Sequence, residues 1–163
     1  MDMPNRKLIP DVIKDQQLVC LPPDASVQDA ALLMAERRVA ALLVTQDRPK
    51  GGRSLKGIFT ERDLAARVVA AGRDPATTRL AEVMTASPDT LGPDAHAYEA
   101  LDLMERHHYR HLPVTADGES DGAVMGIVSI RDLFAVVRAH LEDEIRDREA
   151  FIFGSNYSAS APP

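Results

Sequence analysis

The sequence contains a single cysteine, Cys20, no tryptophan, and no long apolar run. One cysteine cannot form an intramolecular disulfide, and we expect Cys20 to pack as a small hydrophobic side chain in the apolar segment Leu18–Leu21. The longest apolar run, Val39–Val44, is far shorter than the roughly 20 residues that a membrane helix requires. No signal-peptide pattern opens the chain. These absences predict a soluble cytoplasmic protein with no membrane segment.

Basic residues are outnumbered by acidic ones, which gives a formal net charge of −6. Proteins that bind nucleic acid as their main partner need a basic face to neutralise phosphates, so we expect no nucleic-acid partner. A small anion could still bind in a local positive pocket. With 163 residues and 45% hydrophobic content, the chain can form one compact domain or two very small ones.

The dominant feature is an internal repeat. The segment GIFTERDL, Gly57–Leu64, recurs as GIVSIRDL, Gly126–Leu133. Further matched pairs precede it: Pro23-Asp24-Ala25 with Pro93-Asp94-Ala95, Met34 with Met104, and Leu42–Thr45 with Leu112–Thr115. The second copy is one residue shorter, and the difference falls in a polar, glycine-rich segment where a hairpin loop tolerates a change in length.

Each copy predicts the order β-α-β-β-α. The expected strands are Gln17–Leu21, Val39–Val44 and Leu55–Phe59, then Asp89–Pro93, His111–Val114 and Val124–Val128. The expected helix faces have apolar residues at i, i+3, i+4 and i+7: Val27, Ala30, Ala31 and Met34, then Ala97, Ala100, Leu101 and Met104. For the second helices we expect Leu64 and Val68, then Leu133, Val136, Val137 and Leu141, to face inward. Gly72 and Pro75 should end the first of these helices.

Such a unit is too small to bury its own sheet and helices. We therefore predict an α/β (α+β) fold in which the two units pack sheet against sheet, with the helices outside, as one module with pseudo-twofold symmetry. The predicted boundaries are residues 8–73 for the first unit, 74–85 for the linker, 80–141 for the second unit, and 142–163 for a helical extension and tail.

Both copies contain the pattern [ST]-x-x-D, as Thr60–Asp63 and Ser129–Asp132. One interpretation is a helix N-cap, in which hydroxyl and carboxylate each accept from a backbone amide at the start of the helix. The other is an anion site, because a helix N-terminus favours negative charge. The neighbouring Arg62 and Arg131 could pair with a phosphate, and the aspartates could accept from ribose hydroxyls. The two interpretations are compatible.

Together, the repeated motif, the linker Leu80–Thr85 and the segment Arg110–Val114 resemble a CBS domain pair, also called a Bateman module, over Leu8–Leu141. The resemblance implies regulatory binding of AMP, ADP, ATP or S-adenosylmethionine in the cleft between the units. It also implies a free-standing sensor that controls an enzyme or transporter in trans.

In that family the hydroxyl and acid of the repeated motif contact phosphate and ribose. The resemblance therefore implies these roles for Thr60 and Asp63 and for Ser129 and Asp132. It further implies lining by residues near the second strand and at the start of the unit: Val39, Ala41, His111, Pro113, Met84 and Thr85. The first unit has Ile13-Lys14 where the second has Met84-Thr85, so the two sites need not be equivalent. Lys14 could serve a phosphate or be solvated.

Three histidines in Arg106–His111 raise the alternative of a weak metal site. His107 and His111 would share a face only on a continuous helix, whereas the repeat places His111 in the next strand. We expect His111 to contact the nucleotide and no metal to bind. No catalytic motif is present in the sequence, so the protein is predicted not to be an enzyme and to need no obligatory cofactor. The remaining alternative is a structural or interaction module with an empty cleft.

The last segment concentrates aromatic residues, with Phe151, Phe153 and Tyr157 close together. Disordered tails are usually poor in aromatics. We expect a homodimer in which Phe151–Phe153 contacts the second subunit. Docking of this segment on the chain's own surface is the alternative.

Overall fold

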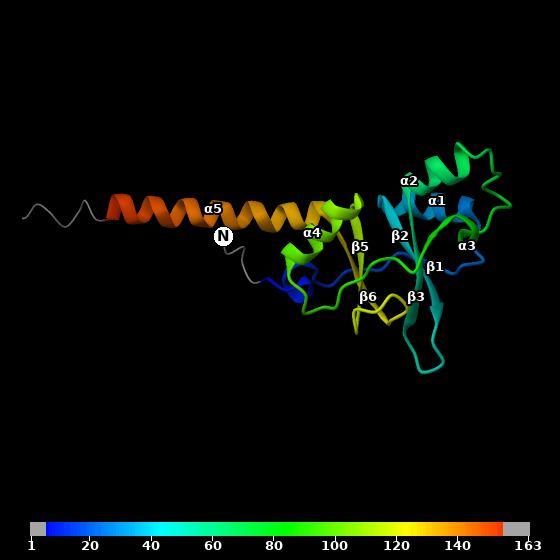
Figure 1. Cartoon of the computed structure of the whole chain (residues 1–163), viewed down its shortest axis with the longest axis horizontal. Coiled ribbons are helices and arrows are strands. Elements are labelled where there is room, and N and C mark those ends of the chain that lie inside the picture. The colour runs from blue at the N-terminus through cyan, green and yellow to red at the C-terminus, as the bar shows by residue number, and fades with distance from the viewer. Residues whose placement is uncertain (1–5, 155–163) are drawn as a thin grey trace, which may run out of the picture.

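A computed structural model describes residues 6–154 as two similar α/β units and a long C-terminal helix that projects from the second unit (Figure 1). The first unit contains β1 (Cys20–Leu21), α1 (Val27–Arg37), β2 (Ala41–Asp47), β3 (Arg53–Thr60), α2 (Glu61–Asp63) and the π-type turn η2 (Leu64–Val69). The second contains α4 (Ala97–His107), β5 (His111–Thr115), β6 (Val124–Ser129) and α5 (Ile130–Gly154). One short element, η1 (Leu8–Val12), precedes the first unit. Two more, α3 (Leu80–Val83) and β4 (Thr85–Ala86), lie between the two units.

The first helix of each unit follows the predicted apolar spacing. In α1 the side chains of Val27, Ala30 and Met34 are buried, and in α4 those of Ala97, Ala100 and Met104 are buried. The hydroxyl of Ser26 caps α1 by accepting from the amide of Asp29 at 3.0 Å. Both helices end on a residue in the left-handed region, with φ 55° at Arg38 and 58° at His108. The chain then turns directly into β2 or β5.

The two sheets meet at a shared apolar layer. The first sheet has the order β1-β2-β3-β4, and the second is the hairpin β5-β6. Inner-face residues of β2 and β3 form a core cluster, against which Val124 and Ile127 of the second unit pack: Ala41, Leu43, Leu55 and Ile58. Cys20 packs against the same cluster, which confirms its predicted role as a small hydrophobic side chain.

The segment that precedes each unit contributes to the hydrophobic core of the other unit. Leu8 and Ile13 lie in the hydrophobic core of the second unit, and Leu80 and Val83 lie in the core of the first. The amide of Leu8 donates to the carbonyl of Ala95 at 2.8 Å, and that of Leu80 donates to the carbonyl of Ala25 at 2.9 Å. Because the core of each unit contains residues from the segment that leads into the other unit, the two units are expected to fold together.

The close approach of these segments depends on two glycines. A Cβ at Gly57 would lie 2.6 Å from Met84 Sδ and 2.7 Å from the carbonyl oxygen of Thr85. Strand β4 pairs there, with Thr85 opposite Ile58. At the equivalent Gly126, a Cβ would meet only the Gln16 and Ile13 side chains, at 3.2 and 3.3 Å.

The side chain of Gln16 takes the place of β4 in the second unit. Its Nε2 donates to the carbonyl of Ile127 at 2.9 Å, and its Oε1 accepts from the amide of Ile127 at 2.8 Å. A side-chain amide thus satisfies the strand edge that a backbone strand satisfies in the first unit.

Two details of the prediction are wrong. The segment Asp89–Pro93 is not a strand, because only Leu91 forms a bridge, to Val114, before Gly92 packs against Gly118. Leu141 does not face inward: its side chain is 50% exposed because α5 has by then run beyond the unit. In residues 6–154 we find no helix with the length and apolar character needed to cross a membrane.

Replacing Gly57 with alanine tests this packing. We expect Gly57→Ala to lower the free energy of unfolding by about 1–3 kcal/mol in urea titrations, because the new methyl meets a backbone carbonyl that cannot move alone. Gly92→Ala is the control, since its Cβ would have only ordinary contacts, 3.8 Å or more away. Equal stability of the two variants would contradict the arrangement of β4.

Candidate functional site

The box in the first unit forms the start of α2. Backbone N and Oγ1 of Thr60 donate to Asp63 Oδ2 at 3.0 and 3.1 Å, and the amide of Asp63 donates to Thr60 Oγ1 at 3.3 Å. This is a reciprocal capping box. Asp63 is buried, with 8% of its surface exposed. The capping interpretation of the motif is therefore correct for this unit.

The second unit repeats the geometry at the start of α5. Backbone N and Oγ of Ser129 both donate to Asp132 Oδ2 at 2.8 Å, and the amide of Asp132 donates to Ser129 Oγ at 3.2 Å. In both boxes Oδ2 of the aspartate serves the helix, so only Oδ1 can differ between the units.

The surroundings of Oδ1 distinguish the two aspartates. Asp63 Oδ1 lies 3.5 Å from Arg67 Nε, and Arg67 Nη1 also donates to the carbonyl of Met84 at 2.8 Å. The residue at the same distance after Asp132 is Val136, which packs against the core. Within residues 6–154 no donor or cation contacts Asp132 Oδ1. One carboxylate is thus already paired with an arginine, whereas Oδ1 of the other accepts from no donor within residues 6–154.

Strand pairing brings the entry of the second strand to each box. Ala41 lies opposite Thr60, and His111 lies opposite Ser129. The amide of Ile130 donates to the carbonyl of Arg110 at 2.9 Å, as that of Glu61 does to the equivalent carbonyl in the first unit at 3.0 Å. The prediction that His111 lies in a strand is confirmed, and the pairing of β5 with β6 places it beside the second box.

His111 is the residue at which charges of both units converge. Burial lowers the pKa of its imidazole, while the carboxylates of Asp132 and Glu61 oppose that change and Arg110 reinforces it. Glu61 belongs to the first unit, so the two helix starts face one another. Arg62 confirms this proximity, because its Nη1 donates to the carbonyl of His108 at 3.3 Å.

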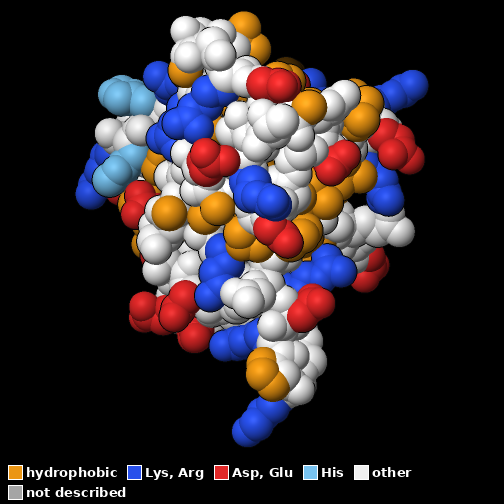
Figure 2. Space-filling model, turned by 90° about the vertical axis from the view of Figure 1, so that its right-hand side faces the viewer, with side chains coloured by type: hydrophobic (Ala, Val, Ile, Leu, Met, Phe, Trp, Pro, Cys, Tyr) orange, Lys and Arg blue, Asp and Glu red, His pale blue; other side chains and the backbone are white. Residues whose placement is uncertain are grey.

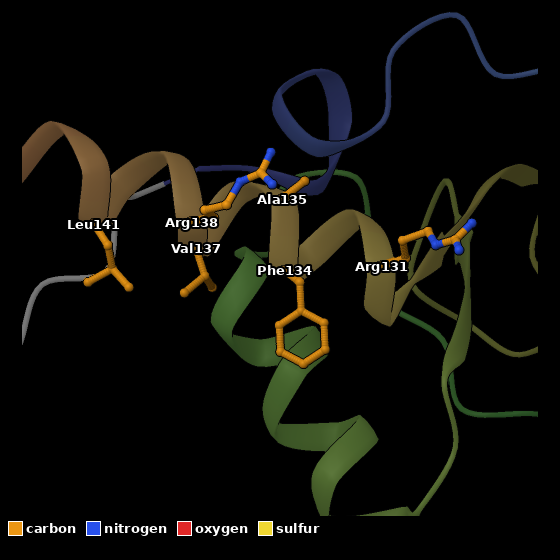
Figure 3. A pocket seen from close by; sticks show the side chains of 6 residues that line it. All are labelled: Arg131, Phe134, Ala135, Val137, Arg138 and Leu141. Atoms are coloured by element: carbon orange, nitrogen blue, oxygen red, sulfur yellow. The ribbon is translucent and has the colours of Figure 1, made fainter.

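The other predicted site residues are distributed over several elements and surfaces. Met84 and Thr85 lie beside β3, and Pro113 is buried within β5. Val39 lines a groove of about 380 Å³ together with Glu61 and Leu64. Lys14 and Arg131 are exposed. Arg131 lines a separate groove along α5 (Figure 3).

Three residues of the site region were missed from the sequence: Gln16, Glu61 and Arg67. Comparing the two repeats position by position would have identified two of them, because Ile130 and Val136 stand where the first unit has Glu61 and Arg67. The role of Gln16 has no sequence signal, since a side chain there replaces a backbone strand.

The histidine segment is not a continuous helix. α4 ends at His107, His108 is left-handed, and His111 opens β5, so the three side chains do not share a helix face. Tyr109 donates from its hydroxyl to Asp89 Oδ2 at 2.9 Å, and burial together with this bond raises its pKa. Across the described part of the chain, no group of three or more His, Cys, Asp or Glu side chains is arranged to hold a metal ion.

Two segments of the chain, residues 11–70 and 80–139, match the family model of the CBS domain. The chain belongs to the CBS domain family. Its two repeats are a CBS domain pair, and the predicted mixed α/β fold with tandem repeats is confirmed.

Solved structures and curated relatives agree with this assignment. A CBS-domain protein from Burkholderia ambifaria MC40-6 is 36% identical, with a TM-score of 0.69 over 80% of this chain and 93% of that one. A CBS domain protein from Pyrobaculum aerophilum, solved in complex with AMP, is 28% identical, with a TM-score of 0.62 over 72% of this chain and 84% of that one. The meiotically up-regulated gene 70 protein of Schizosaccharomyces pombe is 38% identical over 76% of this chain, which spans only 17% of that protein's length.

The lowered pKa of His111 predicts a pH dependence of stability. The unfolded chain binds a proton near the ordinary pKa of 6.5, whereas the folded chain binds it only at lower pH. The free energy of unfolding should therefore decrease as the pH falls below about 6.5, because protonation then favours the unfolded state. The variant His111→Gln should lose less stability than the wild type over this range in urea titrations. Parallel pH profiles of the two proteins would contradict the burial of a neutral imidazole.

Proposed function

We propose that this CBS domain pair is a regulatory module that binds an adenine nucleotide. The ligand class is AMP, ADP, ATP or S-adenosylmethionine. The AMP complex of the Pyrobaculum aerophilum relative supports this class. The module changes no bond in the ligand, and it acts in trans on an enzyme or transporter.

The observation that carries the proposal is the second carboxylate oxygen of Asp132. Its Oδ2 is fully used by the cap, and Oδ1 has no donor in residues 6–154. A pair of ribose hydroxyls would supply charge-assisted hydrogen bonds to that oxygen without dismantling the helix start. The nearby Arg110 and Arg131 could balance phosphate charge.

The second unit is the stronger site in this proposal. Arg67 already pairs with Asp63 Oδ1, so a ribose would have to displace a salt bridge in the first unit. Arg62 and Arg131 are both exposed, but Arg62 already donates to the backbone carbonyl of His108. Ala40 stands where the second unit has Arg110. One tight site and one weak site are expected.

The charge distribution favours a small ligand over a nucleic acid. The face of the first unit shown in Figure 2 intersperses acidic and basic side chains with apolar ones. A ligand between the units would regulate only if it bound two conformations with different affinities. The homodimer proposed from the sequence would give it a second interface on which to act.

The competing function is a structural or interaction module whose boxes are caps only. It predicts that substitutions in the two boxes alter stability alone. The cap geometry is the same in both units, so this alternative gives no reason for Asp63 and Asp132 to differ in a binding assay.

Asparagine at each aspartate separates the two functions. We expect Asp132→Asn to weaken AMP binding by about 10–100-fold in isothermal titration calorimetry, because a charged acceptor for two hydroxyls is lost. Asn retains an oxygen for the Oδ2 hydrogen bonds, so the melting temperature should change little. Asp63→Asn is the matched control and should leave the tight site nearly unchanged.

Titrations with ATP and S-adenosylmethionine extend the same experiment to the rest of the ligand class. Absence of heat with every adenine ligand would reject nucleotide binding. Equal weakening by both asparagine variants would reject the preference for the second unit while retaining the ligand class. Recovery of unaltered nucleotide after incubation is the expected result for a regulatory role.

A further inference from the structure

One face of α5 carries large apolar side chains that lie along a single line of the helix, the apolar stripe. At roughly 100° per residue, Phe134, Leu141, Ile145 and Ile152 fall within about 20° of one line along the helix. Their exposed fractions are 58%, 50%, 58% and 58%. In Figure 3 the side chains of Phe134, Val137 and Leu141 project from the same side of the helix. Four large apolar side chains exposed in one line indicate a surface made for contact.

The stripe has a midpoint that makes it complementary to itself when reversed. Asp143 lies midway between Phe134 and Ile152, and also midway between Leu141 and Ile145. A second copy of α5 running antiparallel through that midpoint would place Phe134 against Ile152 and Leu141 against Ile145. Asp143 points to the opposite side of the helix, so the two copies bring no pair of these carboxylates together.

One oppositely charged pair beside the stripe fits the same register. Arg138 and Glu149 lie on one flank, on opposite sides of the midpoint and at nearly equal distances from it. Reversal therefore brings each Arg138 beside the other copy's Glu149, once at each end of the interface. Arg138 now pairs only loosely with Glu142, at 3.8 Å and on the exposed surface. On the other flank, Glu144 pairs with His140 of its own helix at 3.4 Å.

We propose that two copies of this chain associate through antiparallel pairing of their α5 helices. The second half of one helix occupies the groove of about 560 Å³ that Arg131, Phe134, Val137 and Leu141 line on the other. Because α5 projects away from the two units (Figure 1), antiparallel pairing would place the folded bodies at opposite ends of the pair. This deepens the proposed homodimer and does not depend on nucleotide binding.

The sequence prediction placed the contact at Phe151–Phe153, and the stripe shifts it. Ile152 lies on the stripe, whereas Phe151 and Phe153 fall on its two flanks. Ile152 and Phe153 are 58% and 69% exposed, which argues against the alternative of docking on the chain's own described surface. Tyr157 lies outside the described residues.

Oligomeric state tests the surface. We expect the full chain to sediment as a dimer, and Leu141→Glu to raise the dimer dissociation constant about 30-fold or more by placing a charge at the centre of the stripe. Leu32→Glu is the matched control, because Leu32 is an exposed leucine on α1, 62% exposed and remote from α5. A monomeric wild type, or a dimer disrupted by Leu32→Glu and not by Leu141→Glu, would overturn the proposal.

Disulfide trapping tests the direction of pairing. In a Cys20→Ser background, Phe134→Cys and Ile152→Cys chains should cross-link when mixed, and neither should cross-link with itself. In the antiparallel register, identical positions lie about 27 Å apart, whereas a parallel pair would place them together. Self-cross-linking of either variant without the mixed product would overturn the register. Calorimetry with AMP on Leu141→Glu separates the dimer proposal from the nucleotide proposal. A monomeric variant that still binds AMP would show that nucleotide binding does not require the α5 pairing.

Discussion

In each unit the aspartate of the repeated box accepts two hydrogen bonds through one oxygen and so fixes where a strand becomes a helix. That junction sets the direction of α2 and α5, and through strand pairing it brings Ala41 and His111 to the start of each helix. The cap uses only Oδ2. The cap therefore occupies one oxygen of each aspartate, while the contacts of the other oxygen depend on the neighbouring residues. Two units with the same architecture can for this reason differ in the chemistry of their aspartates.

The exchange of leading segments connects these chemical sites to the cores. Arg67 joins Asp63 Oδ1 to the carbonyl of Met84, so the first box is tied to the linker that completes the first core. Among the described residues the second box has no such connection, and Gln16 instead bonds to the strand that leads into it. A ligand that competed for Asp63 would have to disturb the linker, whereas one at Asp132 would not. The two aspartates thus differ in their connection to the linker as well as in their charge partners.

The sequence predicted the parts of the fold that depend on local periodicity. Repeated apolar spacing located α1 and α4, and the [ST]-x-x-D pattern located both helix starts, because these features involve residues a few positions apart. It failed where a distant side chain decides the outcome. Gln16 substitutes for a strand, Arg67 neutralises one aspartate, and Glu61 approaches His111 across the units. None of these contacts leaves a local pattern, although the mismatch between the repeats marked two of the three.

The contrast between the second helices shows why the surface of α5 calls for its own explanation. In the first unit the helical segment ends at Val69, and Gly72, at φ 66°, turns the chain into the linker. By that point the helix has contributed the buried Val68 to the core of the first unit. In the second unit the buried residue of the helix is Leu133, at the position of Leu64 in the first unit, yet α5 continues to Gly154 and aligns further apolar residues on one face. A packed unit gains nothing from them, and their exposure to water costs free energy unless another surface covers them.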